Sequence, residues 1–350
     1  MDFVTHMATG ALVAQSVCPP EHRWAFALVG AGAAVVPDID FVARLGKNDL
    51  SFLKNHRGLT HSLLAIPIIA TAAAASGNLL FDAPFWPLAA TCVLAAFSHL
   101  VLDVTTHASG IAWLWPHRKR LTWSLFIGLN PLTSSARCSE RRVGTCVRCS
   151  MHSAILNPFV ALVLAGFLAS LAAPSWALAS RISLGVAALY LGAVGWIRWR
   201  ASRLLRKSLG DDGAGGAIEV LRAFPAGFSP MRWLGLVGTD RGVRLFDVNA
   251  LTGRVEPRSD MPPSEDSPVV QATLDTATVR EFLGQAMHPY ARSYAVAGGS
   301  VVIWRDLALA FSPVVSLYTA RVVLDGQRRV VAERFLERWA VPPDTRTLAP

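Results

Sequence analysis

The chain has 350 residues, of which 52% are hydrophobic and only 16% are charged, and its formal net charge is +9. A typical soluble domain carries about 25% charged residues, so this composition argues against an ordinary soluble protein and favours an integral membrane protein. The basic residues cluster beside apolar segments, at 118–120, 137–148 and 198–207, which favours contacts with membrane head groups over a nucleic-acid-binding role.

The apolar segments in the first 200 residues predict membrane helices. The chain start has no basic n-region, so a removable signal peptide is not expected. Two short segments follow, 5–17 and 24–36, and each could span, re-enter or lie on the membrane. The segments 62–81, 85–102 and 154–173 contain no charged residue, and 176–197 contains only Arg181. Each is close to the roughly 20 residues needed to cross a bilayer core, so we prefer a polytopic helical membrane domain to a buried soluble helical core.

The character of the sequence changes after the glycine-rich linker at 210–216. Short alternating stretches replace the long apolar runs and predict a small soluble α+β domain, mostly β, with one helix at 276–287 capped by Thr276 or Asp275. The predicted strands are 232–237, 243–248, 269–274, 301–304, 314–318 and 328–334. The expected fold class is therefore mainly α, a polytopic helical membrane domain carrying a metal site, followed by that small domain. The expected divisions are a helical membrane domain at 1–115, a basic cytosolic loop at 116–153, a transmembrane hairpin with a basic helix extension at 154–209, and a soluble domain at 217–350.

The positive charges also predict an orientation. The segment 176–197 is followed by a basic stretch from Arg198 to Lys207, so its C-terminal end is expected in the cytosol. Counting backwards, the loop at 117–151 is cytosolic and the turn at 78–84 is outside. The acidic and imidazole side chains at the segment ends then share the cytosolic side.

Histidine and aspartate side chains at the ends of these segments predict a metal site, because ionisable groups near a membrane are costly unless they meet a partner or an ion. His99, Asp103 and His107 follow an i, i+4, i+8 spacing, which places them on one face of a helix. His56 and His61 bracket a turn that contains Arg57, a residue suited to an anionic group.

Asp38 and Asp40 follow Pro37 at the end of an apolar segment. They point opposite ways if the backbone is extended, so one is expected to bind metal and the other to bind a second ion or hold a histidine. His6 joins the same side if the first two segments form a hairpin. Mixed His/Asp ligation suits Zn²⁺, Mn²⁺ or Fe²⁺, and the number of residues leaves open more than one ion. The alternative is that these groups are individually satisfied structural residues.

A second, weaker cluster consists of Cys138, Cys146, Cys149 and His152 in the basic loop. Three thiolates and an imidazole can form a structural zinc site, and ordinary reduced cysteines are the alternative.

The motifs around these residues resemble the bacterial membrane-bound, metal-dependent hydrolase family, the LexA-regulated YdjM-like inner-membrane proteins. The resemblance rests on Thr5-His6, Pro37-Asp38-Ile39-Asp40, the block His56-Arg57-Gly58-Leu59-Thr60-His61-Ser62, and the block Ser98-His99-Leu100-Val101-Leu102-Asp103. The family is distantly similar to the zinc-dependent phospholipase C group. The resemblance implies His6, Asp38, His61, His99 and Asp103 as metal ligands. His107 is added as a further ligand, and Asp40, His56 and Arg57 are assigned to catalysis.

The resulting expectation is a metal-dependent hydrolase in the bacterial inner membrane, multi-pass, with its C-terminal domain in the cytosol. A divalent metal, preferably zinc, would activate water against a phosphoester or lipid head group at the cytosolic face. The expected partners are membrane lipids and a small-molecule or lipid substrate, without nucleic acid. The alternatives are a non-enzymatic metal-binding transporter or sensor, and a protein with a purely structural metal and a partner-binding C-terminal domain.

Overall fold

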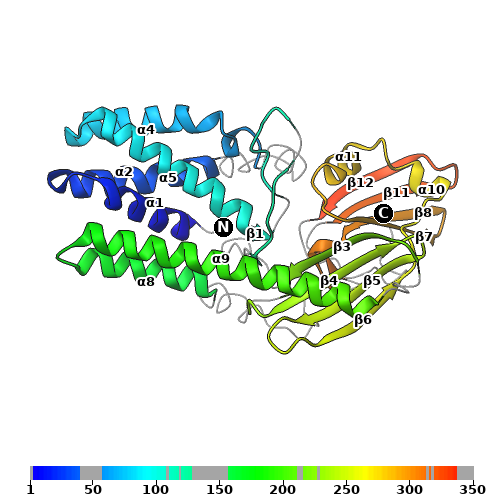
Figure 1. The fold of residues 1–350 in the computed structure, drawn as a ribbon. Helices are drawn as coiled ribbons and strands as arrows, with labels where there is room; N and C mark the ends of the chain where they lie inside the picture. Colours follow the sequence, from blue (N-terminus) through cyan, green and yellow to red (C-terminus); the bar gives the residue numbers. More distant parts are fainter. Residues whose placement is uncertain are drawn as a thin grey trace, which may run out of the picture. The chain divides into compact units, whose positions relative to one another are not determined.

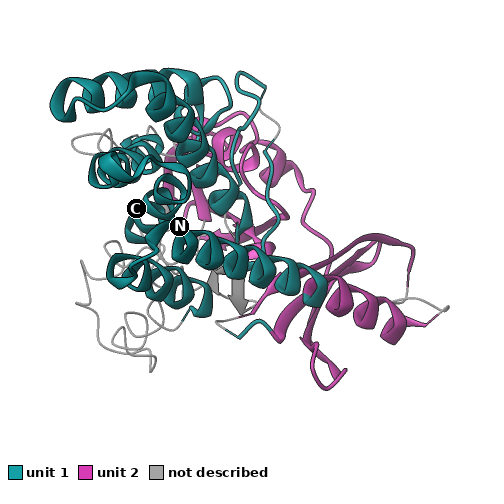
Figure 2. Ribbon diagram, turned by 60° about the vertical axis from the view of Figure 1, so that its left-hand side comes forward, with its two compact units in different colours: residues 1–42, 57–197, 227–230 teal, residues 43–56, 198–226, 231–350 magenta. Residues whose placement is uncertain are grey.

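The computed structural model describes residues 3–39, 57–107, 110–117, 120–127, 157–210, 216–226, 229–312, 315–316 and 319–336. The chain forms two compact units (Figure 2). The first contains the described residues up to Ile197 and residues 229–230, and the second contains the other described residues from Arg198 onward.

The first unit is helical (Figure 1). Its helices are α1 (Phe3–Val17), α2 (Arg23–Val35), α4 (Ala65–Phe81), α5 (Phe85–Thr105), α8 (Pro158–Ala172) and the first part of α9 (Trp176–Leu209). Two 3₁₀ turns, η1 (Pro20–His22) and η3 (Leu59–His61), and a short parallel pair, β1 (Thr106–His107) with β2 (Phe126–Ile127), complete it. The predicted apolar segments are confirmed as helices, and their boundaries shift by only a few residues, apart from the longer extension of α9.

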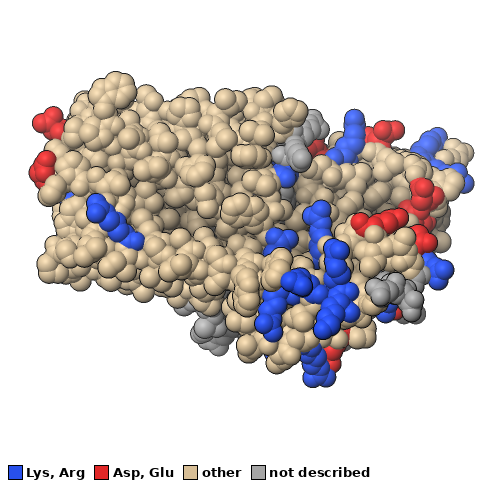
Figure 3. All heavy atoms as spheres, in the orientation of Figure 1, with Lys and Arg blue, Asp and Glu red and all other residues tan. Residues whose placement is uncertain are grey.

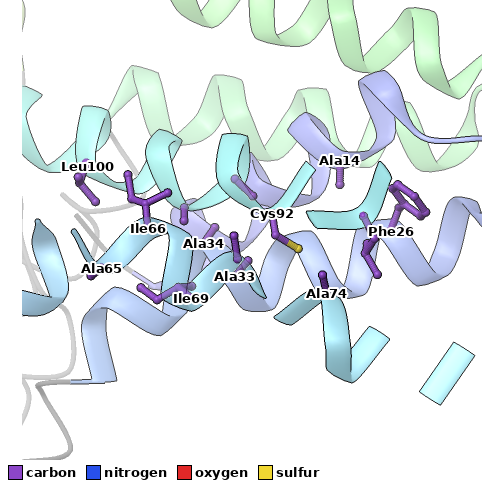
Figure 4. Packing of buried hydrophobic residues seen from close by; sticks show 14 of the residues in the cluster. Ala14, Phe26, Ala33, Ala34, Ala65, Ile66, Ile69, Ala74, Cys92 and Leu100 are labelled. Atoms are coloured by element: carbon purple, nitrogen blue, oxygen red, sulfur yellow. The ribbon is translucent and has the colours of Figure 1, made fainter. Parts of the chain in front are cut away.

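Helix α5 lies at the centre of this packing, since α1, α2 and α4 all contact it. Small side chains fill the core between these helices, including Ala33, Ala34, Ala74 and Cys92 (Figure 4). Small residues let helix backbones approach closely, as is usual where helices pack in a membrane. The close packing holds the ends of α2 and α5 together, where the candidate site lies.

The prediction of a polytopic helical membrane domain is wrong. Among the described residues, two helices are long and apolar enough to cross a bilayer, α5 with 21 residues and α9 with 34. Helices α4 and α8 are apolar but have only 17 and 15 residues, short of the roughly 20 needed. Helices α1 and α2 are also shorter than this, with 15 and 13 residues. The apolar pattern of the sequence predicts too many membrane-spanning helices. Apolar residues that pack one helix on another cannot be distinguished by composition from apolar residues that face lipid.

The second unit contains two four-stranded antiparallel sheets. The first has the order β3-β4-β5-β6, formed by β3 (Ile218–Pro225), β4 (Arg232–Thr239), β5 (Gly242–Asn249) and β6 (Val255–Met261). The second has the order β12-β11-β8-β7, formed by β7 (Pro289–Val296), β8 (Gly299–Asp306), β11 (Thr319–Asp325) and β12 (Val330–Leu336). Shorter elements are α10 (Pro268–Gln271), α11 (Ala277–Leu283), η4 (Leu307–Leu309), β9 (Ala310–Ser312) and β10 (Val315–Ser316).

The sheet-rich C-terminal part agrees with the predicted α+β domain, but the chain as a whole is not mainly α. Its described residues combine eight α-helices with the two four-stranded sheets. The predicted strand at 269–274 is also wrong, because Ser267 caps a helical turn there and Pro268 occupies its first position. The helix predicted at 276–287 is confirmed as the shorter α11, capped by Thr276.

Candidate metal centre

Four side chains from three segments meet at one point of the first unit. His99 and Asp103 project from α5 one helical turn apart, Asp38 follows α2, and His61 ends η3. The i, i+4 spacing on α5 places its two residues on the same helix face. The contact of α2 with α5 then brings Asp38 to that face.

The potential ligand atoms of these four residues all lie within 4.8 Å of one another. The Nε2 of His61 is 3.3 Å from Oδ1 of Asp38 and 3.4 Å from Oδ2 of Asp103. The Nε2 of His99 is 3.7 Å and 3.8 Å from the same two carboxylate oxygens. Two imidazole nitrogens therefore face two carboxylates at distances longer than an ordinary hydrogen bond, which leaves a point that all four could share.

A backbone contact fixes the orientation of His99. Its Nδ1 lies 2.7 Å from the carbonyl oxygen of Ala34 in α2. A carbonyl oxygen can only accept, so Nδ1 carries the proton and, in the neutral ring, Nε2 presents a lone pair. That lone pair points toward the oxygens of Asp38 and Asp103, an arrangement that a cation between them would stabilise. Histidine ligands of metal ions are commonly held in this way through the other ring nitrogen.

His61 is fully buried, and its Nδ1 is 3.1 Å from the hydroxyl of Thr60. Thr60 does not cap the helix that follows. Instead, α4 begins at Ala65, and Thr60 contacts the ring of His61.

His6 lies beside the four residues. Its ring stacks on His99 with 3.8 Å between centroids, and its Nε2 is 3.4 Å from Oδ1 of Asp103. The side chain is completely buried, and neither ring nitrogen has a hydrogen-bond partner in the structure. His6 therefore contacts the cluster through Asp103 and His99 and does not belong to the four groups within 4.8 Å.

Arg57 borders the same cluster. Its Nε is 3.4 Å from Oδ2 of Asp103, and the side chain is buried. The residue adopts a left-handed conformation with φ of 59°, and its carbonyl accepts a hydrogen bond from the amide of Ala112. The positive φ falls on Arg57 and not on the neighbouring Gly58, whose φ is −93°, and the guanidinium of Arg57 lies beside Asp103.

The electrostatics of the cluster favour ionised carboxylates. Burial acts to raise the pKa of Asp38, but the contact with His61 and the nearby His99 and His6 outweigh burial and hold that pKa well below its usual range. Two carboxylates close together are costly unless their charge is balanced, and Arg57 balances only part of it. The donor set of two imidazoles and two carboxylates fits a divalent transition-metal ion, so this cluster could hold one.

The remaining predicted residues are not tested by this geometry. Asp40 and His56 lie outside the described residues, as do Cys138, Cys146, Cys149 and His152. The prediction that His107 shares a helix face with His99 and Asp103 is wrong, because α5 ends at Thr105 and the backbone of His107 forms β1. The side chain of His107 is outside the described part.

Two contacts were missed from the sequence. The carbonyl of Ala34 orients His99, and a backbone acceptor has no sequence signal. The hydroxyls of Thr105 and Thr106, which follow Asp103 in the chain, both donate to the carbonyl of Leu102 and do not contact the cluster in this way.

The family model described as YdjM inner membrane protein matches residues 1–177, which include every residue of the cluster. The chain therefore belongs to the YdjM inner membrane protein family. No curated protein and no solved structure matches the chain.

Proposed function

We propose that this member of the YdjM inner membrane protein family is a membrane metal-dependent hydrolase whose substrates are phosphoesters, lipid head groups included. The observation that carries the proposal is the cluster formed by the side chains of Asp38, His61, His99 and Asp103, with Arg57 at its border. Arg57 supplies one positive charge to the two carboxylates, and a divalent ion among the four groups would balance the remaining negative charge, which supports metal binding.

A bound divalent ion would lower the pKa of a water molecule and polarise a phosphoryl oxygen. Zinc is the preferred ion, with manganese and iron as alternatives, because both histidine nitrogens and aspartate oxygens would be ligands.

The protein's own residues supply charge and orientation. Arg57 presents a guanidinium next to Asp103, and a guanidinium can hold phosphate oxygens through two parallel hydrogen bonds. His6 can exchange a proton between its Nε2 and the nearby Oδ1 of Asp103. Asp40 and His56, which neighbour Asp38 and Arg57 in the sequence, stay predicted catalytic residues.

The proposed orientation places the second unit in the cytosol. Lys and Arg side chains gather over the C-terminal part of α9, whereas few charged side chains are visible over the helices of the first unit (Figure 3). Helix α9 contains no acidic residue, and its basic positions after Ile197 favour the cytosolic side.

The test is hydrolysis of a phosphoester panel, both monoesters and diesters, by the detergent-purified full chain with added Zn²⁺ or Mn²⁺. We expect metal-dependent turnover, reduced at least about 10- to 100-fold by Asp103→Asn, as when a group that orients a metal site is removed. Ser98→Ala is the matched control, because Ser98 neighbours His99 on α5 and its hydroxyl donates to its own helix. A metal-loaded protein that hydrolyses no phosphoester would contradict the proposal and favour a metal-binding transporter or sensor.

A further inference from the structure

The last part of α9 carries positive charges directly after its apolar part. Residues 198–209 contain four arginines and one lysine, and the whole helix contains no acidic residue. Helix α9 is one of the two candidate membrane spans, and it runs without a break from apolar to basic sequence. At a rise of about 1.5 Å per residue, Arg203, Arg206 and Lys207 lie about 9 to 15 Å beyond Ile197 along the helix.

Packing against the first sheet fixes which side of this part of the helix is covered. Ala201 and Leu205 are completely buried. The Cδ2 and Cδ1 atoms of Leu205 lie 2.8 Å and 2.9 Å from the position that a Cβ on Gly235 of β4 would occupy. The Nε of Arg198 donates to the carbonyl of Ala223 on β3 at 3.2 Å. The helix therefore contacts β3 and β4 with one side and is held there by close packing and a hydrogen bond.

The other side of the helix is exposed and basic. It carries Trp199, Arg203, Arg206 and Lys207, called here the basic face (Figure 3). At about 100° per residue, these four positions point away from the buried Ala201. The surface of Trp199 is 53% exposed, and the guanidinium of Arg203 lies over its ring, 4.8 Å from the centroid. An aromatic ring and three charges thus share one exposed surface.

The basic face differs from the other arginines of the second unit in its lack of acidic partners. On the first sheet, arginines pair with carboxylates of the neighbouring strand, as Arg244 does with Asp260 at 3.1 Å. In the part of the chain that the structure describes, no carboxylate forms an ion pair with Arg203, Arg206 or Lys207. Their charges are therefore available to an anionic partner outside the described chain.

We propose that the basic face binds the anionic head groups of the bilayer that α9 enters. Anionic lipids give a membrane surface a negative potential, which attracts basic residues close to a membrane helix. Guanidinium groups suit the phosphate oxygens of a head group, and tryptophan rings favour the level of the head groups. Membership of an inner membrane protein family places such a surface within reach of α9. The proposal concerns the second unit and does not depend on the metal centre or on hydrolysis.

The test measures which lipids the full chain retains. The chain is reconstituted in bilayers of phosphatidylglycerol and phosphatidylcholine in equal amounts and extracted in a non-ionic detergent, and the retained lipids are quantified by mass spectrometry. We expect phosphatidylglycerol to be enriched over its share of the bilayer. The joint substitution Arg203→Gln, Arg206→Gln and Lys207→Gln should lower this enrichment at least about fivefold, the effect expected for one basic residue at an anionic surface.

The matched control removes the same charge from exposed positions of the second unit outside α9, namely Arg241→Gln, Arg280→Gln and Arg328→Gln. This control should keep the enrichment of the unsubstituted chain. Lipid bound at the metal centre would be retained alike by all these proteins, so a difference between them reports on the basic face. The unfolding midpoint in detergent should stay the same in both variants, because the substituted side chains are exposed.

Two further measurements show whether charge is responsible. Arg203→Lys with Arg206→Lys keeps both charges and should retain most of the enrichment. Raising the salt from about 0.1 M to about 1 M shortens the Debye length from about 10 Å to about 3 Å, so the enrichment should fall. Phosphatidylglycerol retained only at its bulk share by the unsubstituted chain would overturn the proposal. An equal loss of enrichment in the control would also overturn it, because net charge alone would then explain the effect.

Discussion

The residues of the candidate metal centre can be identified from the sequence, but their proximity in the fold cannot be derived from sequence spacing. The spacing of His99 and Asp103 alone places both on one helix face. Asp38 and His61 join them only because α2 and η3 end beside α5, which depends on tertiary packing. Local spacing carries no information about such long-range contacts, so the resemblance to known motifs supplied that part of the prediction.

His288 provides a pH-dependent prediction in the second unit. Burial lowers its pKa below the ordinary value of 6.5, and the nearby positive charge of Arg222 lowers it further. The folded chain therefore prefers the neutral ring, while the unfolded chain takes up a proton as the pH falls through 6.5. The stabilising contribution is complete above that pH and is lost as the pH falls toward the folded-state pKa.

We expect stability of the second unit to decline from about pH 7 to about pH 5.5, and to decline less in His288→Gln. Hydrogen exchange of amides in β4 and β7 of the full chain measures this difference. Because other groups titrate alike in both proteins, the difference between the unsubstituted chain and His288→Gln reports on His288. Identical dependence of stability on pH in the two proteins would contradict the role of His288.

At the element scale, two glycines set the distance between α1 and α2. A Cβ atom added to Gly10 would overlap Ala34 and the carbonyl of Gly30. A Cβ on Gly30 would lie 2.6 Å from Cβ of Ala14 and 2.9 Å from the carbonyl of Gly10. The helices therefore contact each other backbone to backbone. This contact matters for the site because α1 carries His6 and α2 carries the carbonyl that orients His99.

Gly10→Ala is expected to force α1 and α2 apart and to destabilise the fold by about 1–3 kcal/mol, the usual cost of overpacking. It should also weaken metal binding, because Ala34 is displaced from His99. Gly32→Ala is the control, since no atom lies within 4 Å of a Cβ there. That substitution should be neutral or stabilising by up to about 1 kcal/mol, from helix propensity. Thermal unfolding in detergent measures both, and equal effects would contradict the packing argument.

Polar contacts also link α1 to the later helices, and the sequence did not indicate them. The side-chain oxygen of Gln15 accepts hydrogen bonds from the hydroxyls of Ser170 on α8 and Ser180 on α9, at 2.9 Å and 3.1 Å. Arg181, the single charge inside a predicted span, donates to the carbonyl of Ser16 at 2.9 Å. Periodicity identifies helices from their own residues, whereas these bonds join positions more than 150 residues apart.

At the scale of the whole molecule, the sequence indicated a helical part followed by a sheet-rich part, and both are present. The number of spanning segments was overestimated, because length and hydropathy do not distinguish a helix that packs on its neighbours from one that faces lipid. Membership of an inner membrane protein family and the two long apolar helices support a membrane location. The cytosolic placement of the second unit stays a prediction.

Reporter fusions test that orientation. A fluorescent protein fused after residue 210 should fluoresce and alkaline phosphatase at the same point should be inactive, because the basic residues that end α9 favour the cytosol. Fusions after Asp82, in the turn before α5, should give the same result, because the two candidate spans α5 and α9 both lie between Asp82 and residue 210. Active phosphatase after residue 210 would reverse the proposed topology.

Asp38, His61, His99 and Asp103 are proposed to bind a metal ion together. The most direct measurement is the metal content of the detergent-purified full chain by elemental mass spectrometry, for the unsubstituted protein, His99→Ala, Asp103→Ala and the Ser98→Ala control. We predict at least about one divalent ion per chain in the unsubstituted protein and the control, and its loss in the other two while folding is retained. A protein that retains no Zn²⁺, Mn²⁺ or Fe²⁺ after reloading, or a His99→Ala variant with undiminished metal content, would contradict the claim.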